Sequence, residues 1–401
     1  MKLRVPACLV LALSIAAVPN PFRAQTPPSD QSLTAHEWGT FTSIAGRDGR
    51  AAEWLPLTGS TDLPGFVEHF RSTDFKGGLR GTVRMETPVL YFYTNHETTI
   101  SVHVSFSQGL ITEWYPQANR VEPVLLQAQM VAYLKDWGAH QKQPASSISW
   151  DSVRLEPSGS AELPRENRAN HYYAARQTSS TPLRIRTQDG DQFEKFLFYR
   201  GVASFSVPVS ARLAPDSKVL AENLSTHEIP ALLLFERRGD KLGFRIADSS
   251  AAQSKLDPPE LTATMDSLKH AVLDMLIAQG LYQDEAQAMF ETWRDSWFEE
   301  GSRLLYIVPR QFVDSVLPLS ISPAPAKTVR VFVGRLELVT PATKQAVEQA
   351  LASHDRATLA KYHRFLVPIV ERILADEKKS SRQAQLREYL KSSSAIVAQL
   401  N

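Results

Sequence analysis

The 401-residue chain has a single cysteine, Cys8, and this scarcity removes several kinds of chemistry. Cys8 lies in an N-terminal leader that we expect to be cleaved, so the mature chain would contain no cysteine. Such a chain cannot form disulfides, thiolate nucleophiles, zinc–cysteine sites or iron–sulfur clusters. Any chemistry of the mature protein is therefore expected to come from other side chains.

Long hydrophobic runs are also missing, apart from a short one near the N-terminus. Residues 5–18 are apolar and follow Lys2 and Arg4, a pattern typical of a secretory signal peptide and too short to span a bilayer. We predict a signal peptide over residues 1–24, with cleavage after Ala24, and a linker over residues 25–33. The mature protein is then expected to be secreted or periplasmic, without a stable membrane anchor.

The chain carries no large excess of charge of either sign. Removal of the first 24 residues lowers the number of basic residues from 44 to 41, against 43 acidic residues. A nearly neutral chain has no overall field that would steer it onto nucleic acid or an anionic membrane. We expect no nucleic-acid partner.

Several sequence motifs that are typical of catalytic sites are absent. The ten histidines form no HxH or HExxH pattern, and there is no GxSxG elbow, phosphate-binding Walker loop or GxGxxG fingerprint. The sequence therefore predicts no metal site and no cofactor.

What the sequence does contain, from about residue 34 to 250, is a series of short segments rich in aromatic and β-branched residues. One of them, "TTISVHVSF" at 98–106, alternates apolar and polar residues with the period of a half-buried strand. Strands without long intervening helices favour antiparallel pairing. We predict an α+β protein whose residues 34–250 form an antiparallel, sandwich-like β region; its strands are expected at 83–93, 98–106, 148–155, 195–209, 229–236 and 241–247.

After residue 257 the apolar period becomes helical. Met289, Phe290, Trp293 and Trp297 form one stripe, which we expect to pack on the sheet. Residues 257–401 are predicted to be a mixed helical region that returns strands to the sheet. Those strands are expected at 303–309 and 328–338, and further helices at 341–353, 355–376 and 382–399.

The segment "HEWGTFTS" at 36–43 contains one of three Glu-Trp pairs, the others being 53–54 and 113–114. Neighbouring side chains of a strand point to opposite faces, so the alternation predicts that each Trp is buried and each Glu is in solvent. His36 and Trp38 share a face. Glu-Trp pairs also occur where carboxylates and aromatic rings bind sugars.

Charged residues also occur inside apolar strands. Arg84 and Glu86 lie two apart in "VRMETPVLYFY", as do Arg335 and Glu337 in "VRVFVGRLEL", and Arg200 ends "FLFYR". A charge buried alone costs several kcal/mol, so these side chains need partners or solvent. They could form a polar outer face, latch sheet to helices, or converge on a polar ligand. We predict that Arg84 and Glu86 lie near Arg335 and Glu337.

Two functions remain open from the sequence. The first is binding of a glycan or other polar small molecule in an aromatic and Arg/Glu-lined cleft. The second is a metal-independent hydrolase with a carboxylate pair drawn from Glu37, Glu86, Glu113, Asp295 and Glu299, the last two expected one helical turn apart. Without a nucleophile motif, binding is favoured; its candidate residues are His36, Glu37, Arg84, Glu86, Glu113, Arg200, Arg335 and Glu337.

Overall fold

A computed structural model describes residues 32–57, 63–69, 79–123, 145–159, 162–247 and 252–399, with side chains through residue 392. The leader, Cys8 and most of the linker lie outside these ranges, so the signal peptide stays a prediction. No helix among the described residues is both long and apolar enough to cross a membrane.

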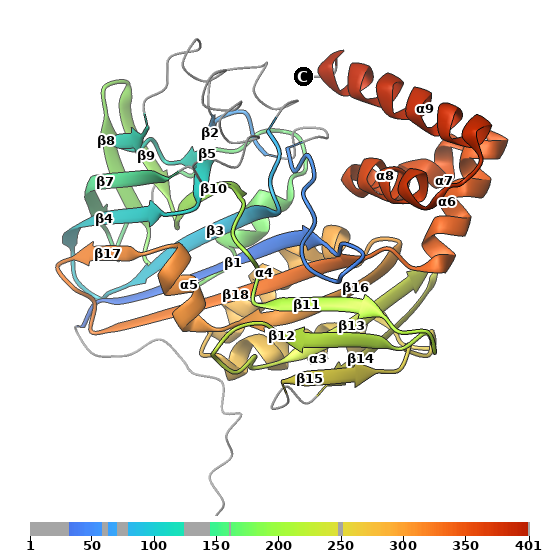
Figure 1. The fold of residues 1–401 in the computed structure, drawn as a ribbon. Helices are drawn as coiled ribbons and strands as arrows, with labels where there is room; N and C mark the ends of the chain where they lie inside the picture. Colours follow the sequence, from blue (N-terminus) through green and yellow to red (C-terminus); the bar gives the residue numbers. More distant parts are fainter. Residues whose placement is uncertain are drawn as a thin grey trace, which may run out of the picture.

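A nine-stranded sheet forms the centre of the molecule (Figure 1). Its middle strands come from opposite ends of the chain, because β1 (Thr34–Ile44) pairs in parallel with β18 (Lys327–Leu338). The other pairs are antiparallel. The full strand order is β14 (Lys241–Ala247), β13 (Leu232–Arg238), β16 (Gly301–Val308), β18, β1, β3 (Val83–Tyr93), β10 (Leu197–Ala203), β5 (Gly109–Tyr115) and β2 (Glu68–His69).

Two smaller antiparallel sheets share a hydrophobic core with one face of the central sheet. Phe41 and Tyr306 of the central sheet belong to the same core as Val102, Trp150 and Ala211 of the smaller ones. The first smaller sheet contains β17 (Leu319–Ser322), β4 (Thr98–Phe106), β7 (Ser146–Leu155), β8 (Leu183–Thr187) and β9 (Gly190–Glu194), with β6 (Arg120–Glu122) beside β7. The second contains β11 (Val209–Leu213), β12 (Val219–Asn223) and β15 (Gln253–Leu256).

Helices cover the other face of the central sheet. They are α3 (Met265–Ala278) and α4 (Gln283–Trp297), and the short 3₁₀ helix η1 (His171–Arg176) packs beside α4. The predicted stripe of α4 is confirmed, since Met289, Phe290, Trp293 and Trp297 are buried in the same core as Trp38 of β1. The central sheet is therefore buried on both faces.

The last helices gather at one end of the central sheet (Figure 1). They pack on Ile44 and Trp54 around a third core. The helix predicted over 355–376 is interrupted, because His363 has a φ of 41°, which an α-helix does not allow. The elements are α6 (Pro341–Ser353), α7 (Arg356–Ala360), η2 (His363–Phe365), α8 (Leu366–Asp376) and α9 (Ser380–Gln399).

The α+β class is confirmed, with strands β16 and β18 returning to the central sheet. The purely antiparallel expectation misses the β1–β18 pair. The strand predicted over 195–209 ends at Ala203, and Pro208, which has no N–H, lies outside it. Helix α5 (Arg310–Val316) and β17 were not predicted, because segments of seven and four residues are too short for a clear period.

Candidate functional site

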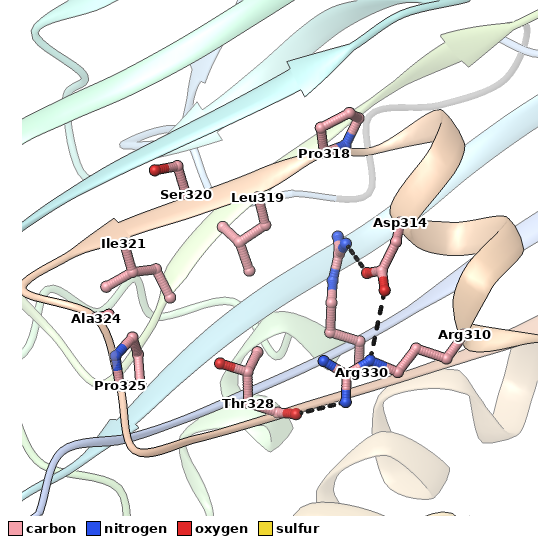
Figure 2. A pocket seen from close by; sticks show the side chains of 10 residues that line it. All are labelled: Arg310, Asp314, Pro318, Leu319, Ser320, Ile321, Ala324, Pro325, Thr328 and Arg330. Carbon is pink, nitrogen blue, oxygen red and sulfur yellow. Dashed lines mark hydrogen bonds and ion pairs between the residues drawn. The ribbon is translucent and has the colours of Figure 1, made fainter.

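A pocket lies between α5, β17 and the first residues of β18. Its volume is about 510 Å³, within the range of small-molecule sites. Figure 2 shows Arg330 and Arg310 reaching Asp314 from β18 and α5, with Leu319 and Ile321 on the facing wall. The remaining lining residues are Pro318, Ser320, Ala324, Pro325 and Thr328.

Arg330 forms the innermost charged part of this pocket, and only 2% of its side chain is exposed. It lies opposite Glu37 in the parallel β1–β18 register, and its Nε donates to Glu37 Oε2 at 2.6 Å. Its Nη1 donates to Asp314 Oδ1 at 2.7 Å. Its buried Nη2 has no hydrogen-bond partner within the part of the chain that the structure describes. One guanidinium thus joins two carboxylates.

The network behind Arg330 fixes its charge. Burial alone would lower the pKa of Arg330, but Glu37 and Tyr199 reverse this and raise it above its ordinary value. Burial, and then the charge of Glu37, raise the pKa of Tyr199, so its hydroxyl stays protonated and donates to Glu37 Oε1. The arginine therefore remains a cation held in one orientation.

The expectation that Glu lies in solvent and Trp in the core holds for one of the three Glu-Trp pairs. The prediction for Glu37 is wrong, because this residue is 0% exposed to solvent. Alternation places Glu in solvent only where one face of a sheet is exposed, whereas β1 is covered on both faces. At 113–114, Glu113 is buried and Trp114 is only partly buried; at 53–54, Trp54 is buried and Glu53 is exposed as predicted.

His36 belongs to a separate buried network on the helical face. Its Nδ1 lies 2.8 Å from Glu285 Oε2, and the Tyr93 hydroxyl donates to Glu285 Oε1 at 2.7 Å. The backbone N–H of Tyr282, which precedes α4, donates to Glu285 as well. His36 and Trp38 share this face, as predicted. Glu285 thus connects the beginning of α4 to β1 and β3.

The predicted residues of β3 and β18 lie on the same sheet, with β1 between them. Thr42 of β1 is paired with Arg84 on one side and Arg335 on the other. Glu86 forms ion pairs with Arg84 and with Arg364 from η2, and accepts a hydrogen bond from Thr42. The two strands are therefore close neighbours, as predicted.

Arg335 and Glu337 find their partners elsewhere than β3. Arg335 Nη2 lies 2.6 Å from Glu299 Oε1 and 3.2 Å from Glu337 Oε2. Glu337 also pairs with Arg303 at 2.9 Å, and Arg303 donates to backbone carbonyls between α4 and β16. These bonds connect strands to the ends of helices. They fit the latch alternative better than an open cleft.

Glu113 and Arg200 form a further pair between neighbouring strands. They are opposite each other in the β5–β10 register, with 3.1 Å between Glu113 Oε2 and Arg200 Nε, and both are nearly inaccessible to solvent. Burial would raise the pKa of Glu113, but Arg200 outweighs it and the net pKa is lowered. The pair stays ionised inside the protein.

Asp295 and Glu299, which were considered as a carboxylate pair for hydrolysis, do not lie together. Asp295 and Glu299 do not share a helical face, because α4 ends at Trp297 and Glu299 follows in the turn. The Asp295 side chain is 95% exposed, whereas Glu299 binds Arg335. Within the described residues, no group of three or more His, Cys, Asp or Glu side chains could hold a metal ion.

Sequence reasoning missed Arg310, Asp314, Tyr199 and Arg330. Arg330 satisfies the criterion applied to Arg335, a charge inside an apolar strand, so it could have been found. Asp314 lies in a helix too short to give any signal. No protein-family model and no curated protein matches this chain, so its site is defined here by geometry alone.

Proposed function

We propose that this protein binds a polar ligand with an anionic group, such as an acidic glycan, in the pocket at Arg330. One observation carries the proposal: two arginines, Arg310 and Arg330, line a single pocket, and Arg330 is almost fully buried and held by two carboxylates.

The side chains that line the pocket include more cations than anions. Two guanidinium groups, Arg310 and Arg330, face a single lining carboxylate, Asp314. Glu37 balances Arg330 from behind and does not line the pocket. Arginine presents donors in a planar fork that matches a carboxylate, which favours ligands with such a group.

The remaining walls suit a sugar ring. Leu319, Ile321 and Pro325 offer an apolar surface for the C–H face of a ring, and Thr328 adds a polar side chain to the lining. A volume of about 510 Å³ accommodates a small oligosaccharide unit. A uronic acid combines these features with a carboxylate.

Binding is favoured over hydrolysis by the position of Glu37. Acid–base hydrolysis of a glycoside needs two carboxyl groups that reach the bond from opposite sides. Asp314 reaches the pocket, but both Glu37 oxygens are occupied, by Arg330 and Tyr199, and the residue has no exposure. The pocket therefore offers one accessible carboxylate.

The proposed location is the periplasm or the exterior of the cell, on the strength of the apolar leader and its basic flank. Cell fractionation followed by N-terminal sequencing tests this. A mature chain beginning at Gln25 outside the cytoplasm is expected. A full-length chain in the cytoplasm would contradict the proposal.

Calorimetric titration with a galacturonic acid trimer and with the neutral galactose trimer tests the function. We expect binding of the acidic trimer only, weakened roughly tenfold in Arg310→Gln, the loss typical of one charge-assisted hydrogen bond. Arg186→Gln is the matched control, because that side chain is 82% exposed and lies on β8 outside the pocket. Equal binding of both trimers, or no effect of Arg310→Gln, would contradict an anion-specific pocket.

A further inference from the structure

A second cleft lies at the opposite end of β18 from the Arg330 pocket. It has a volume of about 200 Å³ and is bounded by the turn after β1, by β11, and by α6 and α8. The turn is held in place by hydrogen bonds from Ala45 to Glu337 and from Ala211 to Gly49. The cleft is thus formed by secondary structure and a fixed turn.

Positive charge dominates this cleft. Its lining includes Arg47, Arg212, Lys344 and Arg372 and no carboxylate. The nearest counter-ion is Asp376, which binds Arg47 and Lys344 and lies 3.8 Å from Arg372 Nε. Asp376 therefore balances three of the cations, with a smaller contribution from Asp48 to Arg372, and Arg212 adds a fourth.

Two of these cations occupy unfavourable positions. Lys344 lies in the first turn of α6, which contains no acidic residue, where a positive charge opposes the helix dipole. Arg372 Nε is buried without a hydrogen-bond partner among the described residues. Burial, and then the neighbouring Arg47, hold the pKa of Arg372 below its usual value. Both positions would be stabilised by an added anion.

We propose that this cleft binds a tetrahedral oxyanion, either inorganic phosphate or sulfate or the same group as an ester of a larger molecule. Such an ion fits within about 200 Å³ and accepts several hydrogen bonds at once. Its charge would offset the excess of the four cations. This site is separate from the Arg330 pocket and does not depend on the function proposed there.

Titration of the full-length protein with sodium phosphate tests the proposal, against sodium chloride at equal ionic strength. A parallel titration with glucose 6-phosphate and glucose distinguishes a free ion from an ester. Binding of inorganic phosphate supports a free ion, and binding of glucose 6-phosphate alone supports an ester ligand. Binding of neither would overturn the proposal.

Variants locate the binding. Lys344→Gln should weaken it roughly tenfold, the loss of one charge-assisted contact, whereas Asp376→Asn should strengthen it because a competing carboxylate is gone. Lys255→Gln is the matched control, since this exposed lysine pairs with Asp216 and does not line the cleft. Unaltered binding in Lys344→Gln, with native thermal unfolding, would contradict the site.

Discussion

At the scale of single residues, buried and partly buried arginines pair with carboxylates from distant parts of the chain. Arg330 pairs with Glu37, and Arg364 pairs with Glu86, across separations of more than 270 residues. Removal of one member leaves the other charge buried and unpaired, which costs far more than the intact pair contributes. These positions are therefore sensitive to substitution even where they touch no ligand.

Glu37→Gln tests this sensitivity. We expect a loss of about 3–5 kcal/mol in the free energy of unfolding, because Arg330 would keep its charge without its buried partner. Urea denaturation followed by tryptophan fluorescence measures the loss. Glu53→Gln serves as the control, since its side chain is 36% exposed and 3.8 Å from Arg80, and should change stability by less than ~0.5 kcal/mol. Similar losses in both variants would contradict the account.

The buried carboxylates also predict how stability depends on pH. Burial would raise the pKa of Glu86, but Arg364 and Arg84 outweigh it, so the folded-state pKa lies below 4.5. The unfolded chain then binds more protons near pH 4, and stability falls as pH drops through the folded-state pKa.

Glu113, whose pKa is lowered as well, behaves in the same way. We expect Glu113→Gln to reduce the slope of stability against pH below about pH 4.5; an unchanged slope would show that other groups control acid unfolding.

At the scale of elements, α4 joins the central sheet through both its ends and its apolar face. Glu285 at its beginning contacts His36 and Tyr93, and Arg303 holds the carbonyls that follow its end. The stripe between these ends is buried against β1 and β3. The helix is thus positioned by polar contacts and stabilised by apolar ones.

Trp293→Ala measures the apolar contribution. Truncation of this side chain, which is 2% exposed, should cost about 3–5 kcal/mol. Arg294→Ala changes the next residue, whose side chain is 49% exposed, and should cost little. Binding at the Arg330 pocket should persist in Trp293→Ala wherever the protein is folded. Lost binding with unchanged stability would mean that Trp293 is a ligand residue.

At the scale of the whole molecule, the parallel β1–β18 pair makes the two halves of the chain interdependent. Strands β16 and β18, which follow residue 250, lie in the central sheet between β13 and β1, which precede it. Neither half can complete that sheet alone. We expect one cooperative unfolding transition, with fluorescence and circular dichroism midpoints that coincide.

A chain truncated at residue 250 should remain unfolded by circular dichroism, because it lacks β16, β18 and the helices that cover one face of the sheet. The full-length protein under the same conditions is the control. A truncated chain with a cooperative transition of its own would show that residues 34–250 fold independently.

The sequence predicts much of the secondary structure but little of the pairing. Alternation identified β4 and the helical period identified the α4 stripe, since both patterns lie within one segment. Periodicity carries no information about which strand lies beside β1, so its parallel partner and the burial of Glu37 were missed. The Arg330 pocket depends on that pairing and on the short α5, which explains why only Glu37 of its network was predicted.

The position of a bound ligand tests the central proposal most directly. Arginine Nε–H signals in ¹⁵N-labelled protein can be followed by NMR during titration with the galacturonic acid trimer, after assignment with Arg310→Lys and Arg330→Lys. The proposal predicts that the signals of Arg310 and Arg330 shift with one saturating dissociation constant, while those of Arg303 and Arg335 stay in place. Unchanged Arg310 and Arg330 signals at saturating ligand, or shifts confined to other arginines, would contradict it.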